Sequence, residues 1–459
     1  MSEAATALPA APTTFGGHPR GLQTLFFTEM WERFSYYGMR TLLVLYMTAP
    51  PDAGGLGFPV ADATAIYGWY TGLVYFSAMP GGFLADQVLG QRRAVMLGGL
   101  FIALGHFLLA FRSLPLFYIG LGSIILGTGL LKPNVSTLVG GLYPPGDNRR
   151  DGGFSIFYMG INLGGMLGPL ACAYLAQDAG FIAWLGAHGF HPGSSWHFGF
   201  AAAGVGMVGG VIQFALGLKH LGAIGDPPAK GAARSKDTSL GGGFTSEETK
   251  RLIVIAIFFV FTSFFWAAYE QAGSSLNLFA DRVTDNTVLG HSFPSGYYQS
   301  INSLFIIGFA PVFAWLWVRL GAREPSSPAK FGWSLLAVGC SFLAVGAGAL
   351  VFQKTGQKVS PAWLLGTYLF ATWGELALSP VGLSTVTKLA PPKVAALSMG
   401  VWFLSLSVGN KAGGWIAGHF DPNGSMSSLF FNIAGVSFAA AVVLFVLTPW
   451  IKKLMSGVK

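Results

Sequence analysis

The sequence carries little charge. Only 10% of its 459 residues are charged, whereas a soluble globular chain usually has about 25%. Hydrophobic residues make up 52%, and they come in blocks of about 20, the length that crosses a hydrocarbon core of about 30 Å. The scarcity of charge excludes a water-soluble particle of this size and indicates an all-α protein that spans a membrane several times.

Cysteine is also scarce, and no secretion signal is evident. Cys172 and Cys340 both fall within apolar segments, so they are interpreted as small hydrophobic residues without a disulfide or a redox role. Residues 1–20 are rich in alanine, proline and threonine and have no basic cluster before an apolar core. They predict a disordered tail rather than a cleavable signal peptide.

The net charge of +8 does not indicate a nucleic-acid partner, because basic residues concentrate in the loops on one side of the membrane. With both termini placed in the cytoplasm, the outer loops hold only Arg112, Arg282, Lys354 and Lys358, and the inner loops and tails hold most of the others. This bias predicts an even number of spans with both termini cytoplasmic.

Twelve spans are expected, separated by turns rich in proline, glycine and asparagine. A polar stretch at 221–250, with three successive glycines, predicts a flexible cytoplasmic linker between residues 21–220 and 251–451, and 452–459 form a cytoplasmic tail. Six spans on each side predict two six-helix bundles with a site between them near the midplane. The expected spans are 21–48, 61–84, 94–112, 115–140, 152–175, 196–220, 252–280, 295–320, 331–353, 361–388, 394–420 and 428–451.

The first span contains four ionisable groups, Glu29, Glu32, Arg33 and Arg40. Each costs roughly 2.5–3.5 kcal/mol at the centre of a membrane, so this helical face must turn toward a wet cavity. Glu29 and Arg33 are four residues apart and face the same way as Tyr37 and Arg40. The pair could be purely structural. Alternatively, protonation of the carboxylate would free the arginine, which couples a proton to an anionic group of a solute.

Single charges lie in other spans. Lys132 belongs to the fourth span, Glu270 to the seventh and Glu375 to the tenth, so cations gather in the first half and carboxylates in the second. Pairs across the halves could form and break as the bundles move, and static pairing is the alternative. Lys411 is close to a helix end and is given no role. Polar and aromatic side chains that accompany these charges are Tyr36, Tyr37, Tyr75, Tyr158, Asn162, Trp266, Asn302 and Trp402.

The segment at 29–38, Glu-Met-Trp-Glu-Arg-Phe-Ser-Tyr-Tyr-Gly, resembles the first-helix signature of the proton-dependent oligopeptide transporters. Residues 81–93 resemble the loop motif between the second and third helices, although Ala94 stands where a threonine is frequent. The segments 157–164, 299–302 and 374–380 also match family motifs. The resemblance covers nearly the whole chain and implies the major facilitator superfamily fold. Many bacterial members have two extra helices between the bundles, but 221–250 is too short and polar for them, so twelve transmembrane helices are expected.

The resemblance implies a symporter that imports di- and tripeptides with protons by alternating access. It implies a monomer in the cell inner membrane, with the proton as coupling ion and no other cofactor. Glu29, Glu32, Arg33 and Glu270 would couple the proton. Gating ion pairs would form between Arg40 and Glu270 at the outer side and between Lys132 and Glu375 at the inner side. Arg33 and Lys132 would bind the peptide carboxylate and Glu375 its amino group, in a pocket that also includes Tyr37, Arg40, Tyr75, Asn162, Trp266, Asn302, Ser379 and Trp402.

Other functions stay open from the sequence. A carrier of the same fold could move another solute, such as nitrate or a peptide-like drug, and a channel is a third possibility. A membrane-embedded enzyme has little support, because neither a Gly-x-Ser-x-Gly motif nor a zincin spacing of histidines occurs. His188 and His191 have metal-ligand spacing in an outer loop, but they lack a third partner, so no metal site is expected.

Overall fold

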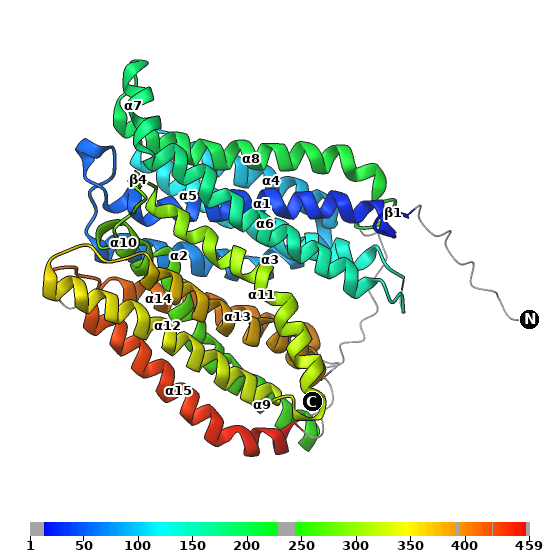
Figure 1. Ribbon diagram of the computed structural model, residues 1–459. Helices are drawn as coiled ribbons and strands as arrows, with labels where there is room; N and C mark the ends of the chain where they lie inside the picture. The colour runs from blue at the N-terminus through cyan, green and yellow to red at the C-terminus, as the bar shows by residue number, and fades with distance from the viewer. Residues whose placement is uncertain (1–12, 145, 228–243, 392–393, 425, 456–459) are drawn as a thin grey trace, which may run out of the picture.

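The computed structural model describes residues 13–144, 146–227, 244–391, 394–424 and 426–455. Long helices run side by side in two groups, one from the first half of the chain and one from the second (Figure 1). The groups lie close together at the end that carries α7 and α10, here the α7 end. They diverge toward the end that carries β1 and the C-terminus, here the linker end (Figure 1).

The first group is the N-terminal bundle. Its six spanning units are α1, α2 with α3, α4, α5, α6 and α8, and short elements connect them. In chain order the elements are β1 (Thr13–Phe15), β2 (His18–Pro19), α1 (Arg20–Thr48), η1 (Pro51–Ala53), α2 (Val60–Phe76), α3 (Ala78–Leu84), η2 (Ala85–Leu89), α4 (Gln91–Leu109), α5 (Leu114–Gly141), α6 (Arg150–Gln177), α7 (Ala179–Ala187), η3 (Pro192–Ser194), α8 (Ser195–Gly217) and η4 (Leu218–His220).

The second group is the C-terminal bundle, whose spanning units are α9 with α10, α11, α12, α13, α14 and α15. Its elements are α9 (Ser246–Tyr269), η5 (Glu270–Gly273), α10 (Ser275–Arg282), β3 (Thr287–Val288), β4 (His291–Ser292), η6 (Ser295–Tyr298), α11 (Gln299–Leu320), η7 (Gly321–Arg323), α12 (Ser327–Thr355), α13 (Ala362–Leu389), α14 (Ala395–Ala417) and α15 (Met426–Leu454). The two groups together supply the twelve spans expected from the sequence.

Eight of the described helical segments are long and apolar enough to cross a membrane by length and composition alone. The units α1, α2 with α3, α13 and α14 are not among them. They nevertheless pack directly on the eight, since α1 lies against α6 and α8, and α14 lies against α2 and α9. The polar groups that lower the apolar character of α1 are therefore held between helices rather than exposed to lipid.

Several expectations from the sequence need correction. Residues 13–19, assigned to a disordered tail, form the β1–β2 hairpin; residues 1–12 lie outside the described residues. The linker is shorter than 221–250, because α9 begins at Ser246. The Thr245 hydroxyl accepts a hydrogen bond from the Glu248 backbone N–H, and the Glu248 carboxylate accepts one from the Thr245 backbone N–H, a capping box that fixes this helix start. The linker residues 228–243 lie outside the described residues. The short helix α7 was not foreseen.

Two expected spans are interrupted. The span expected at 61–84 divides at Ser77, whose hydroxyl donates to the Ile125 carbonyl of α5 at 2.9 Å. The span expected at 252–280 divides at η5, which begins with Glu270. Broken spans are common where transporters bind solutes, because the freed backbone and side chains line a cavity.

Glycine allows α1 and α6 to approach closely. A methyl group added at Gly164 would lie 2.2 Å from the carbonyl oxygen of Met30 and 2.9 Å from Cβ of Arg33. We expect Gly164→Ala to destabilise the protein by about 1–3 kcal/mol, because α1 and α6 must separate. Gly122→Ala is the control, since nothing lies within 4 Å of its added methyl group. Thermal unfolding in detergent should show a lower midpoint for Gly164→Ala alone. Equal midpoints for the two variants would contradict this packing.

The two bundles are joined by polar contacts near the α7 end. The side-chain amide of Asn277 in α10 donates to the Thr41 carbonyl of α1 at 2.7 Å. Ser300 in α11 donates to the Met166 carbonyl of α6 at 2.7 Å, and Ser407 in α14 bonds to α2 at 2.7 Å. These bonds close the α7 end across three separate helix pairs.

Candidate functional site: charges between the two bundles

The charged groups of α1 are buried. Glu29, Glu32, Arg33 and Arg40 are each at most 4% exposed. Arg33 Nε donates to Glu29 Oε1 at 2.8 Å and lies 3.0 Å from Glu32 Oε2. The expected pair between Glu29 and Arg33 is therefore present, and Glu32 adds a second carboxylate to the same guanidinium. Helical spacing did not predict this third member, because adjacent residues point in different directions.

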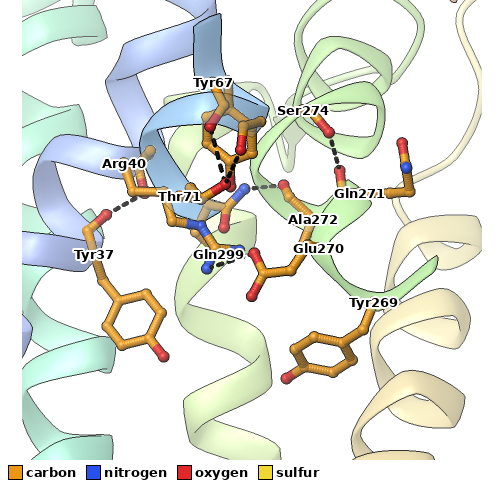
Figure 2. Close-up of polar contacts among 12 residues, drawn as sticks. Tyr37, Arg40, Tyr67, Thr71, Tyr269, Glu270, Gln271, Ala272, Ser274 and Gln299 are labelled. Carbon is orange, nitrogen blue, oxygen red and sulfur yellow. Dashed lines mark hydrogen bonds and ion pairs between the residues drawn. The ribbon is translucent and has the colours of Figure 1, made fainter. Parts of the chain in front are cut away.

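A second ion pair joins the two bundles toward the α7 end. Arg40 Nη1 of α1 lies 3.1 Å from Glu270 Oε2 of η5, and Figure 2 shows the two side chains pointing toward each other. Both residues are 3% exposed. The break between α9 and α10 places Glu270 at this height, where it meets a cation from the other half. The ion pair between Arg40 and Glu270 that the resemblance implies is thus present.

The inner gating pair is not formed. Lys132 Nζ lies 3.9 Å from the centroid of the Tyr75 ring, and no ion pair of Lys132 is seen among the described residues. Glu375 instead accepts hydrogen bonds from the Tyr269 hydroxyl and, at 3.2 Å, from Asn302 Nδ2. The expectation of a Lys132–Glu375 pair is wrong for this conformation, because neutral donors satisfy the carboxylate and an aromatic face holds the ammonium. The two bundles diverge toward the linker end (Figure 1), whereas the ion pair and hydrogen bonds described above join them near the α7 end.

A narrow cavity adjoins the outer pair. Tyr37, Arg40 and Asn302 line it, together with residues that the sequence analysis did not select, among them Tyr269, Gln299, Ser341 and Tyr368. Its free volume is about 30 Å³, which holds water rather than a peptide. Tyr269 and Gln299 could have been suspected, since Tyr269 precedes Glu270 and Gln299 opens the segment that contains Asn302. Nothing in the sequence marks Ser341 or Tyr368.

The remaining predicted pocket residues differ in their contacts. Asn162 donates to the Tyr158 carbonyl of its own helix at 3.0 Å. The ring nitrogen of Trp266 and the hydroxyl of Ser379 are buried, and neither has a hydrogen-bond partner among the described residues. The Trp402 ring packs against Phe331 with ring centres 6.2 Å apart, so it supports the C-terminal bundle.

The histidine pair of the outer loop is engaged in local contacts. His188 Nδ1 lies 2.8 Å from the Trp184 carbonyl, and His191 Nδ1 accepts from the Gly193 backbone at 3.1 Å. Within the described residues, no group of three or more histidine, cysteine, aspartate or glutamate side chains is placed to hold a metal ion.

Two six-helix bundles with opposite charges on facing helices define a multi-pass membrane transporter of the major facilitator type. The POT family model matches residues 92–235 and 244–430, and the chain belongs to this family. It is 40% identical to the uncharacterized transporter YclF of Bacillus subtilis (strain 168), over 97% of this chain and 96% of that protein. It is 35% identical to a di-/tripeptide transporter of Lactococcus lactis subsp. cremoris, over 97% and 98%.

Solved structures share the fold along almost the whole chain. A mutant of a peptide transporter POT in complex with alafosfalin matches with a TM-score of 0.86 and 39% identity, covering 98% of each chain. A POT family transporter in complex with 5-aminolevulinic acid matches with a TM-score of 0.85 and 31% identity, covering 96% of this chain and 99% of that one.

Proposed function

We propose that this protein imports di- and tripeptides together with protons by alternating access. The observation that carries the proposal is the separation of charge between the two bundles. Lys132 of the N-terminal bundle has an aromatic ring beside its ammonium and no ion pair among the described residues, and Glu375 of the C-terminal bundle is contacted there only by neutral donors. A short peptide with free ends has the complementary arrangement, a carboxylate at one end and an ammonium at the other. The named di-/tripeptide transporter among the relatives supports the same substrate class.

The proton acts on the buried ion pairs. Two carboxylates, Glu29 and Glu32, share the guanidinium of Arg33, so protonating one of them leaves the other to balance Arg33 and loosens the cluster. Protonating Glu270 would remove the charge that holds Arg40 across the bundles and would favour opening of the outer side. In this scheme the proton is the coupling ion, and no other cofactor is needed.

We further propose that the protein resides in the cell inner membrane, with both termini in the cytoplasm, and works as a monomer. Figure 1 places β1 and the described C-terminus at the linker end, and the excess of basic loop residues supports a cytoplasmic location for that end. A monomer suffices because one chain contains both bundles and the complete set of charged groups.

The second candidate is a carrier of the same fold for another solute. The related structures that hold alafosfalin and 5-aminolevulinic acid favour it, because they show that ligands other than ordinary peptides occupy this fold. An amino acid such as 5-aminolevulinic acid also carries an amine and a carboxylate, so charge complementarity alone does not distinguish the two candidates.

Uptake into liposomes tests the proposal. Purified protein in proteoliposomes should accumulate labelled dialanine when the interior is alkaline, and a proton ionophore should abolish the accumulation. Unlabelled di- and tripeptides should compete, whereas tetrapeptides, nitrate and 5-aminolevulinic acid should compete weakly. Competition by 5-aminolevulinic acid but not by trialanine would favour the second candidate, and uptake that does not saturate would indicate a channel.

A further inference from the structure

A second, larger cavity lies at the linker end of the C-terminal bundle. It has a volume of about 690 Å³ and is formed by the ends of α11, α12, α13 and α15. Its lining contains three lysines, Lys330, Lys388 and Lys452, and a single carboxylate, Glu324. The lining is therefore cationic even after Glu324 is counted. This cavity contains none of the residues of the transport site described above.

Part of the lining is buried and held in place by specific contacts, as expected of a binding site. Lys330 is 7% exposed, lies 2.5 Å from Glu324 Oε1 and has its ammonium 4.3 Å from the centre of the Trp317 ring. These contacts fix one cation in the wall. Lys388 and Lys452 are exposed side chains from two other helices, and both belong to the wall of the cavity. Ser327, Ser384 and Thr385 add hydroxyl groups to the wall.

The cavity lies at the level where the surface of the membrane is expected. Exposed tryptophans surround this end of the bundle: Trp315 in α11 is 56% exposed, Trp333 in α12 is 51% exposed and Trp450 in α15 is 49% exposed. Tryptophan concentrates where lipid headgroups meet the hydrocarbon. Basic pockets between helices at the cytoplasmic surface bind the phosphate of anionic lipids.

We propose that this cavity is a binding site for a phosphate-bearing anion, supplied either by an anionic lipid headgroup or by free phosphate. Lys388 and Lys452 bind the phosphate, and Lys330 with the hydroxyl groups forms the floor of the site. The location on the cytoplasmic side rests on the proposed orientation, whereas the binding itself does not depend on which solute is transported.

Lipid binding by the purified full-length protein tests this site. Native mass spectrometry of delipidated protein should show phosphatidylglycerol bound in preference to phosphatidylcholine. The double variant Lys388→Gln/Lys452→Gln should bind phosphatidylglycerol roughly thirtyfold more weakly, since each basic residue near a membrane surface contributes about a fivefold effect. Both lysines are exposed, and a thermal unfolding midpoint equal to that of the wild type checks that the double variant is folded.

A charge-matched control separates the site from general surface attraction. Lys250 and Lys453 are exposed at the same end and do not line the cavity, so Lys250→Gln/Lys453→Gln should retain binding close to that of the wild type. Thermal unfolding with inorganic phosphate shows whether the bound anion is a lipid headgroup or free phosphate. If phosphate stabilises the wild type but not Lys388→Gln/Lys452→Gln, and no lipid is preferred, the site binds free phosphate. The proposal is overturned if neither ligand distinguishes the variants, or if the control loses as much as the cavity variant.

Discussion

Proteoliposomes that contain Glu32→Gln are expected to lose all proton-driven accumulation of dialanine, yet to exchange labelled for unlabelled peptide. Glu32 is fully buried, and its Oε2 lies 3.0 Å from Arg33 Nε. Glutamine has nearly the same shape but cannot take up or release a proton. The variant therefore keeps a pocket that binds peptide and loses one of the groups through which the proton gradient acts.

The measurement compares accumulation under a pH gradient with exchange at equal pH on both sides. Glu247→Gln is the matched control, because Glu247 is an exposed carboxylate in the first turn of α9, and it should accumulate peptide as the wild type does. Accumulation against the peptide gradient by Glu32→Gln would exclude Glu32 from coupling. Loss of both accumulation and exchange would assign Glu32 to binding or folding instead.

The second large effect concerns recognition of the two peptide ends. Lys132→Gln is expected to weaken dialanine binding roughly ten- to hundredfold, the value of a hydrogen bond to a charged group. It should leave dialanine amide, which has no terminal carboxylate, almost unaffected. Glu375→Gln should show the opposite discrimination, with weaker binding of dialanine and little change for N-acetyl-dialanine. The reason is that Lys132 and Glu375 lie on opposite bundles and are not paired to each other.

Inhibition of peptide exchange by each ligand gives the required affinities. Lys411→Gln is the control for Lys132→Gln, since Lys411 is also a lysine within a span but has its ammonium 4.3 Å from the centre of the Trp69 ring. It should not distinguish dialanine from its amide. If Lys132→Gln weakens the two ligands equally, Lys132 acts on the conformation of the protein rather than on the peptide carboxylate.

The sequence predicted the features that repeat along the chain or cost much free energy. Twelve spans follow from apolar length, and the buried groups of α1 follow from the expense of charge in a membrane. Both were found in the structure. The pairing of Arg40 with Glu270 came from the family resemblance, because no local rule relates two residues so far apart in sequence.

Other features depend on packing that a pattern does not contain. Tyr269 and Asn302 are the partners of Glu375. The conformation of the bundles determines that they, rather than Lys132, contact this carboxylate. The resemblance assigned Trp402 to the pocket, and only the structure shows that its ring packs beside Phe331 and against Gly382. The interruption at Glu270 was not predicted, although the apolar run ends there and a mostly polar stretch follows from Glu270 to Asn277.

Part of the contact between the two bundles is made by backbone atoms without side chains between them. Where α2 meets α14, a methyl group on Gly414 would come within 2.5 Å of the Cα of Gly68. Such contact leaves no room for water, and it also involves little apolar side-chain surface that would be re-exposed on separation. The contact between these two glycines therefore excludes water but contributes little to the stability of the closed state. We therefore expect the polar contacts beside it, such as the ion pair between Arg40 and Glu270, to hold the α7 end closed, and protonation of Glu270 would weaken that pair.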